Sequence, residues 1–434
     1  MKIEQPIQLL EMIRCLSQAI DLVSPIMADH HRRVAHIAVS IARELELPPD
    51  RIPALAIAGA LHDVGGLSLA MRLDALRFES HNAHEHAALG YLLLKTFRPF
   101  AEAAELVKFH HVEWESGAGA EFCGEQVPLE SRILHLADRI AALLKPDVAV
   151  LTQAKTISER ILEQSGKMFP PELTAVFSQV ASRECFWLEA IFSKTDTNLI
   201  QVLGTAELPR DEDLSGLTRL ICRIIDFRSP FTATHTSGVA ASAVALARLA
   251  GFSELDCNRM EVAGFIHDLG KLAVPSEILD KQANLTKEEF DIIRTHTYHT
   301  DHILKPIQGF DTIRQWGALH HERLDGKGYP FHLTAKDLSI GSRIVSIADA
   351  FVALTENRPY RIGLDRQEVL QLLGNMVRNS ALDGELVALL AENFEKINQR
   401  RIEAQDEATR EYRDFIRQAK ELQEACDQRS HGAA

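Results

Sequence analysis

The stretch GFIHDLG at residues 264–270 decides the fold, because the similar string GALHDVG stands at residues 59–65. In both copies another histidine stands 32 residues before the His-Asp pair. Two further pairs of strings repeat in the same order, FHHVE (109–113) with LHHER (319–323) and ILHLADRIAAL (133–143) with IVSIADAFVAL (344–354). Coincidence does not account for so many matched spacings, so the chain contains two copies of one unit.

Apolar residues recur at helical spacing in both copies. The first copy shows this spacing at Val34, Ile37, Ile41 and Leu45, and the second at Val239, Ala243, Leu246 and Leu249. The string TKEE at residues 286–289 indicates a helix start with a capping box. No long alternating run indicates a sheet, so the sequence predicts an all-α fold of two tandem helical domains plus a C-terminal helix.

A domain junction is indicated at residues 195–213, where helical periodicity is lost and glycine, proline and charge accumulate. The predicted organisation is a first domain, a linker, a second domain and a charged C-terminal helix, at residues 1–195, 196–213, 214–395 and 396–426. That helix carries a narrow apolar stripe at Ala408, Tyr412, Phe415, Ala419 and Leu422. The stripe fits either pairing between the subunits of a homodimer or docking on the chain's own core.

Net charge and cysteine placement limit the partners and the compartment. The chain has 47 Lys and Arg against 61 Asp and Glu, a formal charge of -14, so its surface as a whole repels nucleic acid and anionic membranes. No run of about 18 uncharged apolar residues occurs. The six cysteines lack a CxxC pair or disulfide-like spacing, which indicates a reducing compartment. We therefore expect a cytoplasmic protein with no membrane and no nucleic acid polymer as partner.

The histidines and aspartates of the second copy predict a metal site. A single histidine on an apolar face is usually a core residue, but here imidazoles and carboxylates recur together. They supply the donor mixture that suits Fe, Mn, Zn or Ni, and burying them without an ion is costly. Two ions roughly 3.5–4 Å apart activate water and clamp a phosphate, which makes phosphoester hydrolysis the natural chemistry. The set is His235, His267, Asp268, His296, His320, His321 and Asp349.

The second copy resembles the HD-GYP family, a branch of the HD phosphohydrolases. The resemblance extends from about Asp213 to Phe394 and rests on HDLGK (267–271), HHERLDGKGYP (320–330) and ADAFVALTENRPYR (348–361). Members of the family hydrolyse cyclic dinucleotides, chiefly cyclic di-GMP, to a linear dinucleotide or to mononucleotides. The resemblance implies a metal-dependent phosphodiesterase, with cyclic di-GMP as the default substrate and 3′,3′-cyclic GMP-AMP as the nearest alternative.

The resemblance also implies a role for each matching residue. The seven histidines and aspartates would bind metal, with Asp268 as the bridge between two ions. Lys271 would contact the scissile phosphate, and Arg358 and Arg361 would hold the other phosphate. For the two arginines a plain surface role fits the sequence equally well. A loop near the site entrance, where the family also has signalling-partner contacts, would be shaped by Gly326, Gly328, Tyr329 and Pro330.

Two positions depart from the family pattern. Trinuclear members carry a glutamate four residues before the first ligand histidine, where this chain has Phe231. We therefore expect two divalent transition metals, with Fe or Mn favoured and Ni or Zn open. The family also has an aspartate three residues after the last ligand, where this chain has Val352, which puts ligand geometry, substrate choice or rate in doubt.

The first copy keeps a complete ligand-type set but lacks the substrate residues. Gly66 stands where Lys271 stands in the second copy, and neither a GYP loop nor an RPYR string occurs. The two open interpretations are a degenerate HD-like domain kept for packing or dimerisation, and a metal-loaded regulatory domain. The set is His30, His62, Asp63, His86, His110, His111 and Asp138, with His31 as an alternative to His30.

Two other functions compete with cyclic-dinucleotide hydrolysis. Other HD phosphohydrolases act on mononucleotides or alarmones, although the GYP and RPYR strings argue against that activity here. A catalytically weak cyclic-dinucleotide receptor would result if Val352 had disabled turnover while binding persisted.

Overall fold

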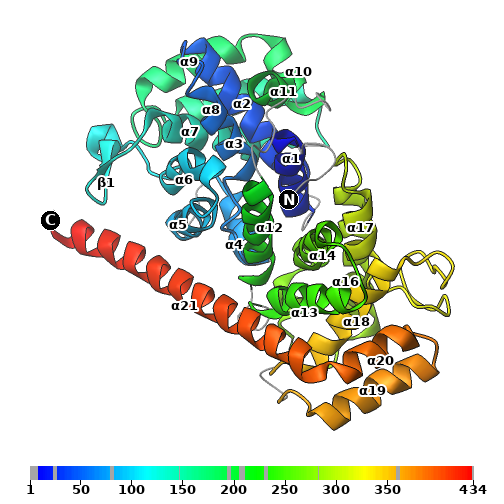
Figure 1. The fold of residues 1–434 in the computed structure, drawn as a ribbon. Coiled ribbons are helices and arrows are strands. Elements are labelled where there is room, and N and C mark those ends of the chain that lie inside the picture. Colours follow the sequence, from blue (N-terminus) through cyan, green and yellow to red (C-terminus); the bar gives the residue numbers. More distant parts are fainter. Residues whose placement is uncertain are drawn as a thin grey trace. The chain divides into compact units, whose positions relative to one another are not determined.

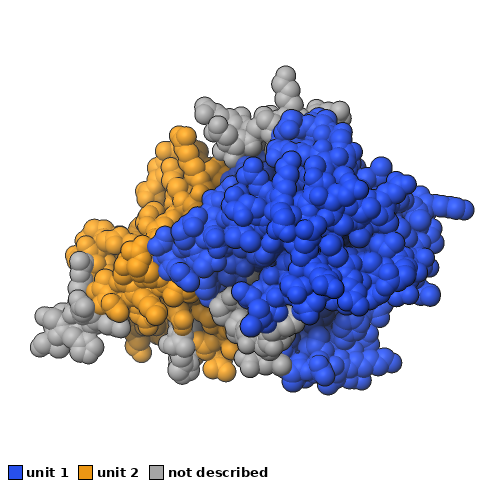
Figure 2. Space-filling model, turned by 60° about the horizontal axis from the view of Figure 1, so that its bottom comes forward, with its two compact units in different colours: residues 1–7, 207–414 blue, residues 8–206, 415–434 orange. Residues whose placement is uncertain are grey.

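The computed structural model describes residues 8–22, 27–78, 83–145, 147–192, 197–204, 211–228, 233–281, 283–357 and 362–432. The chain divides into two compact units, which Figure 2 shows in different colours. Unit 1 comprises residues 1–7 and 207–414, and unit 2 comprises residues 8–206 and 415–434. The boundary between residues 206 and 207 falls inside the segment predicted as a linker.

Helices make up nearly all of the regular secondary structure described in unit 2 (Figure 1). They are α1 (Leu9–Asp21), α2 (His30–Glu44), α3 (Ile52–Leu61), α4 (Leu69–Ala75), α5 (Ala83–Leu94), α6 (Ala101–Lys108), α7 (Leu129–Leu143), α8 (Val150–Leu162), α9 (Pro171–Ala181), α10 (Glu184–Phe192) and α11 (Thr197–Leu203). Two 3-10 turns accompany them, η2 (Arg98–Phe100) and η3 (Glu115–Ala120). Strands β1 (Glu121–Phe122) and β2 (Glu125–Gln126) pair antiparallel and form the only sheet within the described ranges.

Unit 1 is likewise helical. Its elements are α12 (Asp211–Asp226), α13 (His235–Leu249), α14 (Glu254–Ile266), the 3-10 turn η4 (Leu269–Ala273), α15 (Ser276–Leu279), α16 (Lys287–Leu304), α17 (Asp311–Ala318), α18 (Ile340–Thr355), α19 (Arg366–Arg378), α20 (Gly384–Glu392) and the first half of α21 (Phe394–Gly432). The prediction of an all-α fold is confirmed.

The His and Asp residues lie in or shortly after the same five helices in both units. Helices α2, α3, α5, α6 and α7 of unit 2 correspond in order to α13, α14, α16, α17 and α18 of unit 1. We expected the His-Asp pair to lie within one helix, but α14 ends at Ile266 and Asp268 has φ -97° and ψ 11°. The pair therefore stands where the helix ends, and the chain turns there.

Two glycines let the ligand-bearing helices cross closely. A Cβ atom at Gly264 would lie 2.5 Å from Cα of Ala240, and one at Gly59 would lie 2.6 Å from Cα of Ala35. The obstructing atoms belong to the backbone, so a side chain there would push the helices apart. The glycine three residues before each His-Asp pair thus fixes the packing of α13 on α14 and of α2 on α3.

Side-chain caps set the start of helices that carry site residues. Thr286 Oγ1 accepts a hydrogen bond from Glu289 N at 3.2 Å, and the Glu289 carboxylate accepts one from Thr286 N at 2.7 Å. This confirms the predicted capping box at the start of α16. Ser339 caps α18 in the same way, by accepting a hydrogen bond from Ser342 N at 3.3 Å.

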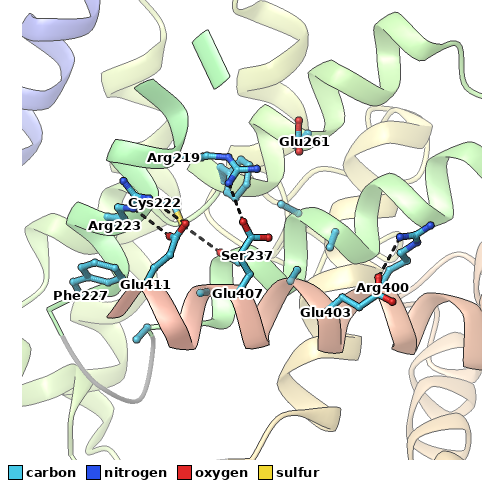
Figure 3. Close-up of a pocket in the computed structure, with 16 residues that line it drawn as sticks. Arg219, Cys222, Arg223, Phe227, Ser237, Glu261, Arg400, Glu403, Glu407 and Glu411 are labelled. Atoms are coloured by element: carbon cyan, nitrogen blue, oxygen red, sulfur yellow. Dashed lines mark hydrogen bonds and ion pairs between the residues drawn. The ribbon is translucent and has the colours of Figure 1, made fainter. Parts of the chain in front are cut away.

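The first half of α21 docks on unit 1. A hollow of about 280 Å³ lies between α12, α13 and this helix, and Figure 3 shows the Arg–Glu pairs beside it. Arg223 Nε lies 3.2 Å from Glu411 Oε2, and the Tyr412 ring packs edge-on against Phe227 with centroids 5.2 Å apart. Ala408 is buried as well. Of the two predicted uses of the apolar stripe, this part of it packs on the chain's own core.

Cysteine pairing differs from the expectation at one position. Cys123 is disulfide-bonded, whereas Cys15, Cys185, Cys222 and Cys257 are free thiols. Spacing along the sequence did not indicate this bond. Within the described ranges, no helix combines the length and the apolar character that crossing a membrane requires.

Candidate metal centres

Five segments of unit 1 bring the seven predicted ligands together. His235 lies at the start of α13, and His267 and Asp268 lie directly after α14. His296 lies in α16, His320 and His321 lie in the turn after α17, and Asp349 lies in α18. Most of these side chains are buried, but His321 is 30% exposed and Asp349 is 16% exposed. A molecule from solvent would therefore reach the cluster on the side of these two residues.

Asp268 presents one carboxylate oxygen to each of two groups of histidines. Its Oδ2 lies 3.2 Å from His267 Nε2. Its Oδ1 lies 3.4 Å from His296 Nε2 and 3.9 Å from His320 Nε2. A carboxylate placed in this way fits a bridge between two metal ions.

Asp349 joins the first of these groups. Its Oδ1 lies 3.1 Å from His235 Nε2 and 4.0 Å from His267 Nε2. Its Oδ2 lies 3.9 Å from Nδ1 of His321, the partly exposed histidine. Two aspartates and the imidazole nitrogens around them thus form one continuous cluster.

Backbone carbonyls fix which ring nitrogen faces the cluster. Nδ1 of His267, His296 and His320 bonds to the carbonyl oxygen three residues earlier, at 2.7, 2.6 and 2.7 Å. A carbonyl accepts a hydrogen bond, so Nδ1 carries the proton. The Nε2 lone pair of each neutral ring is then directed into the site, as metal ligation requires.

Two buried polar atoms of the cluster have no hydrogen-bond partner among the described residues that would replace a metal ion. Within the described part of the chain, His267 Nε2 and Asp268 Oδ1 are buried and form no hydrogen bond. Leaving such atoms unsatisfied costs roughly 1–3 kcal/mol each. A divalent transition metal would satisfy both atoms, and the mixture of imidazole and carboxylate suits such an ion. The residues therefore fit a metal.

The surroundings of Asp268, His296 and His320 favour protonation states that bind metal. Burial raises the pKa of Asp268, but His267 and Lys271 outweigh burial and hold that pKa well below its ordinary value. Burial lowers the pKa of His296 to about 3 and holds that of His320 well below its ordinary value. The carboxylate is ionised and the two imidazoles are neutral. Burial lowers the pKa of His235, but Glu356 and Asp349 outweigh burial and raise it to about 10.

Lys271 lies at the edge of the cluster, in the turn η4. Its Nζ is 2.6 Å from Asp268 Oδ2, and its side chain is 22% exposed. Burial lowers the pKa of Lys271, but the charge of Asp268 outweighs burial and raises it above its ordinary value. A fixed cation therefore stands beside the carboxylate that faces both histidine groups.

The loop after His321 is held by a buried carboxylate. Glu322 accepts hydrogen bonds from the backbone of Phe331 at 2.7 Å and of Leu333 at 3.0 Å. Tyr329 N donates to His321 O at 3.2 Å, and the two rings have centroids 5.0 Å apart. The loop thus places Tyr329 beside the most exposed of the predicted ligands.

Sequence reasoning missed Glu356. Its carboxylate lies 3.1 Å from His235 Nδ1 and is buried. Glu356 stands one helical turn after Val352, which is itself fully buried. The signal in the sequence was an acid four residues after the position where the family's aspartate is missing; Glu356 is the first residue after α18.

Three predicted positions lie outside the described residues: Arg358, Arg361 and Phe231. The roles of the two arginines and the metal count inferred from Phe231 therefore stay predictions.

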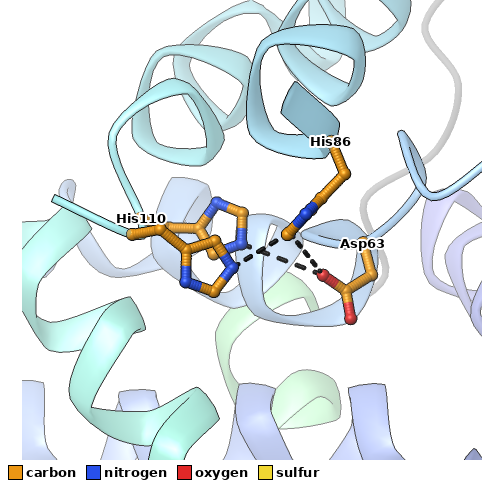
Figure 4. Close-up of side chains that lie close together, drawn as sticks. Asp63, His86 and His110 are labelled. Atoms are coloured by element: carbon orange, nitrogen blue, oxygen red, sulfur yellow. Dashed lines mark hydrogen bonds and ion pairs between the residues drawn. The ribbon is translucent and has the colours of Figure 1, made fainter. Parts of the chain in front are cut away.

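The predicted ligands of unit 2 come together in the same pattern (Figure 4). Asp63 Oδ1 lies 3.2 Å from His86 Nε2 and 3.9 Å from His110 Nε2. Asp63 Oδ2 lies 3.3 Å from His62 Nε2, and His111 Nε2 lies 2.9 Å from His86 Nε2. Asp63 thus faces two groups of histidines, as Asp268 does.

His30, and not its neighbour His31, belongs to the unit 2 cluster. His30 Nε2 lies 3.2 Å from Asp138 Oδ1. Nδ1 of His31 instead pairs with Asp21. These contacts favour His30 over His31 as the ligand, a choice that the sequence left open.

Two buried arginines distinguish the surroundings of the unit 2 cluster. Arg139 Nη2 lies 2.5 Å from Asp138 Oδ2, and its guanidinium also donates to backbone carbonyls. Arg72 Nε donates to Gly66 O at 2.6 Å, and a Cβ atom at Gly66 would lie 2.8 Å from Arg72 Cγ. The counterpart of Lys271 is therefore a glycine packed under an arginine and supplies no cation.

Comparison with protein families defines the class. A family model described as HD domain matches residues 14–165 and 219–386, which is more than half of the chain. The chain therefore belongs to the HD domain family, and the match falls on both repeats.

Individual relatives match different shares of the chain. The chain is 27% identical to 3′3′-cGAMP-specific phosphodiesterase 1 of Vibrio cholerae serotype O1, over 92% of this chain and 94% of that protein. It is 32% identical to 3′3′-cGAMP-specific phosphodiesterase 3 of the same organism, over 62% of this chain and 57% of that protein. A cyclic di-GMP phosphodiesterase of Pseudomonas aeruginosa is 31% identical over 42% of this chain and 43% of its own length. The crystal structure of the V. cholerae phosphodiesterase V-cGAP3 has the same fold, with a TM-score of 0.62, 23% identity, and coverage of 90% of this chain and 98% of that one.

Proposed function

We propose that unit 1 is a metal-dependent phosphodiesterase that hydrolyses a 3′-5′ phosphodiester bond of a cyclic dinucleotide. The observation that carries this proposal is the position of Asp268 between two groups of buried imidazoles, with the Lys271 ammonium 2.6 Å from its Oδ2. The names of the relatives, which are phosphodiesterases of 3′3′-cGAMP or of cyclic di-GMP, support the same reaction.

The ligand set would hold two divalent ions, Fe or Mn by preference, with Asp268 as a ligand of both. When bound, such ions would supply an activated water and neutralise charge on the phosphoryl oxygens. One ion would be held by His235, His267, Asp268 and Asp349, and the other by Asp268, His296, His320 and His321. Lys271 stabilises the charge that develops on a phosphoryl oxygen, and its ion pair with Asp268 holds Nζ in place.

We favour 3′,3′-cyclic GMP-AMP as the substrate. The relative that matches 92% of this chain is named for that nucleotide, whereas the Pseudomonas cyclic di-GMP phosphodiesterase matches only 42% of it. A binding protein without turnover is disfavoured. Glu356, the residue directly after α18, supplies a carboxylate to His235, although Val352 stands where the family has its aspartate.

Product analysis with purified full-length protein tests the proposal. The protein is reconstituted anaerobically with Fe²⁺ or Mn²⁺, and 3′,3′-cyclic GMP-AMP and cyclic di-GMP are supplied separately. We expect a linear dinucleotide or mononucleotides from the wild type and none from His267→Ala. Tight nucleotide binding without any product from the metal-loaded wild type would instead identify a receptor.

We also propose that unit 2 binds metal but does not hydrolyse cyclic dinucleotides. Nε2 of His30, His62 and His110 and both oxygens of Asp63 are buried and form no hydrogen bond to any described residue. These atoms support a metal site, because leaving them unsatisfied is costly. Gly66 offers no counterpart to Lys271, which argues against hydrolysis.

Charge around the unit 2 cluster also argues against an anionic substrate. A pocket of about 410 Å³ lies beside His111 and Arg139. Its lining includes the exposed acids Glu113, Glu115 and Glu121. A cyclic dinucleotide carries two phosphates, so this rim would repel it.

A further inference from the structure

The C-terminal helix α21 reaches a predicted metal ligand of unit 1 through two buried polar side chains. Gln405 lies in α21 and is buried; its Nε2 lies 3.4 Å from Glu356 Oε2. Glu356 in turn holds His235 Nδ1 at 3.1 Å, and Nε2 of the same ring lies 3.1 Å from Asp349 Oδ1. A continuous chain of contacts therefore runs from α21 to the centre of the site.

The surroundings of Gln405 are shaped to admit it. A Cβ atom at Gly238 would lie 2.9 Å from Gln405 Nε2, so the glycine in the first turn of α13 leaves room for the amide. The buried guanidinium of Arg401, one turn earlier in α21, donates to Gln405 Oε1. That donor orients the amide, because Oε1 is occupied and the NH₂ group is left to face Glu356.

Unit 2 lacks these parts, although its ligand set matches. The position that corresponds to Glu356 holds Lys145, which is exposed. The position that corresponds to Gly238 holds Arg33, which is buried. The contacts that link Gln405 to Glu356 and His235 are therefore specific to unit 1, and the helical fold that the two units share does not require them.

We propose that Glu356 and Gln405 are positioning residues that orient His235, so that metal binding by unit 1 depends on the docking of α21. The inference rests on the metal centre of the proposed function. A carboxylate on Nδ1–H fixes the tautomer and the plane of the ring, directs Nε2 to the ion and makes the imidazole a stronger ligand. Gln405 restricts the carboxylate to the orientation in which it faces His235.

Metal titration of the full-length protein tests the proposal. Mn²⁺ affinity is measured in Glu356→Gln, Gln405→Leu and the double variant. The matched controls are Glu392→Gln and Gln399→Leu, which change exposed residues of the same types in α20 and α21. All titrations are repeated with Asp63→Ala, so that ions bound by unit 2 do not enter the measurement.

We expect Glu356→Gln to weaken Mn²⁺ binding about 10-fold or more, since loss of a partner on a ligating imidazole costs about 10–100-fold. Gln405→Leu should weaken it less, and the double variant should be no worse than Glu356→Gln alone, because both residues act through one ring. The controls should bind as the wild type does. Saturating Mn²⁺ should restore binding in each variant.

Two results would overturn the proposal: Mn²⁺ affinities of Glu356→Gln and Gln405→Leu equal to those of the controls, or effects of the two substitutions that simply add. If Glu356→Gln does not fold, Gln405→Leu with its own control decides alone. Because the measurement is of metal and not of turnover, a wild type that binds Mn²⁺ but cleaves no cyclic dinucleotide would refute the proposed function and leave this test intact.

Discussion

The number of metal ions bound per chain tests most directly whether each of the two units has a metal site of its own. Asp63 and Asp268 each present both carboxylate oxygens to buried imidazoles, at 3.2–3.9 Å in unit 2 and 3.2–3.9 Å in unit 1. If each carboxylate bridges two ions, the wild type should hold about four ions per chain, and either alanine substitution should leave about two. The double variant should hold almost none.

Elemental analysis of anaerobically reconstituted, desalted protein measures these numbers, and Asp50→Ala, an exposed aspartate of unit 2, serves as the control. Turnover is measured on the same samples. Asp268→Ala should keep the unit 2 ions and lose all hydrolysis, whereas Asp63→Ala should lose ions and keep hydrolysis. A metal content in Asp63→Ala equal to that of the control would refute a metal site in unit 2, and loss of every ion in Asp268→Ala would do the same. Circular dichroism of each variant excludes loss of the fold as the cause.

Three further predictions concern rate and stability. Lys271→Met should lower kcat by about 10²–10³-fold, the usual cost of removing one group that stabilises transition-state charge; equal kcat at equal metal content would show that the lysine has no part in the chemistry. Asp383 caps the start of α20 by accepting hydrogen bonds from the backbone of Glu385 and Leu386, and Arg343 donates to its other oxygen at 2.8 Å. Burial raises the pKa of Asp383, but Arg343 outweighs burial and the pKa lies below its ordinary value. The cap therefore stabilises the fold above about pH 4, and this benefit is lost as the pH falls below that value. Asp383→Ala should therefore cost about 1 kcal/mol of unfolding free energy at pH 7 and less at pH 3, as measured by urea unfolding. Gly264→Ala should cost about 1–3 kcal/mol in the same assay, because its Cβ would lie 2.5 Å from Cα of Ala240; a stability equal to that of the wild type would show that the two helices separate freely.

The helical fold was predictable from the sequence because its signals are local. Spacing of apolar residues gave the helices, and TKEE at residues 286–289 gave the start of α16 as observed. The repeat of strings gave the correspondence of five helices between the units. Cys123 shows the limit of this reasoning, since a disulfide depends on the distance and orientation of two side chains in the folded chain.

Much of the candidate site was also predictable, because each ligand type lies at a fixed offset from a recognisable string. The roles of Glu356 and Gln405 were not predictable, because they depend on contacts between side chains that lie far apart in the sequence. Glu356 faces His235 across 121 residues of sequence, and Gln405 reaches Glu356 from the charged C-terminal helix, for which the sequence left pairing between subunits and docking on the chain's own core both open. His30 against His31 was undecided for the same reason, since only the orientation of each ring distinguishes two adjacent residues.

Packing of the fold explains the glycines of the repeated motif, but it does not explain the histidines and aspartates, which metal binding does explain. The glycine after each His-Asp pair is required by the fold: a Cβ atom at Gly65 would lie 2.0 Å from His86 O, and one at Gly270 would lie 1.9 Å from His296 O. A copy retained only for packing would need these glycines, but apolar side chains of similar size would fill the cluster at lower cost than buried imidazoles. Unit 2 nevertheless keeps the whole ligand set around Asp63, while Gly66 has replaced the cation that the proposed chemistry needs. On the proposal that unit 2 binds metal, metal binding and phosphodiester cleavage are separable properties of the HD domain, and unit 2 has the residues for the first without the lysine for the second.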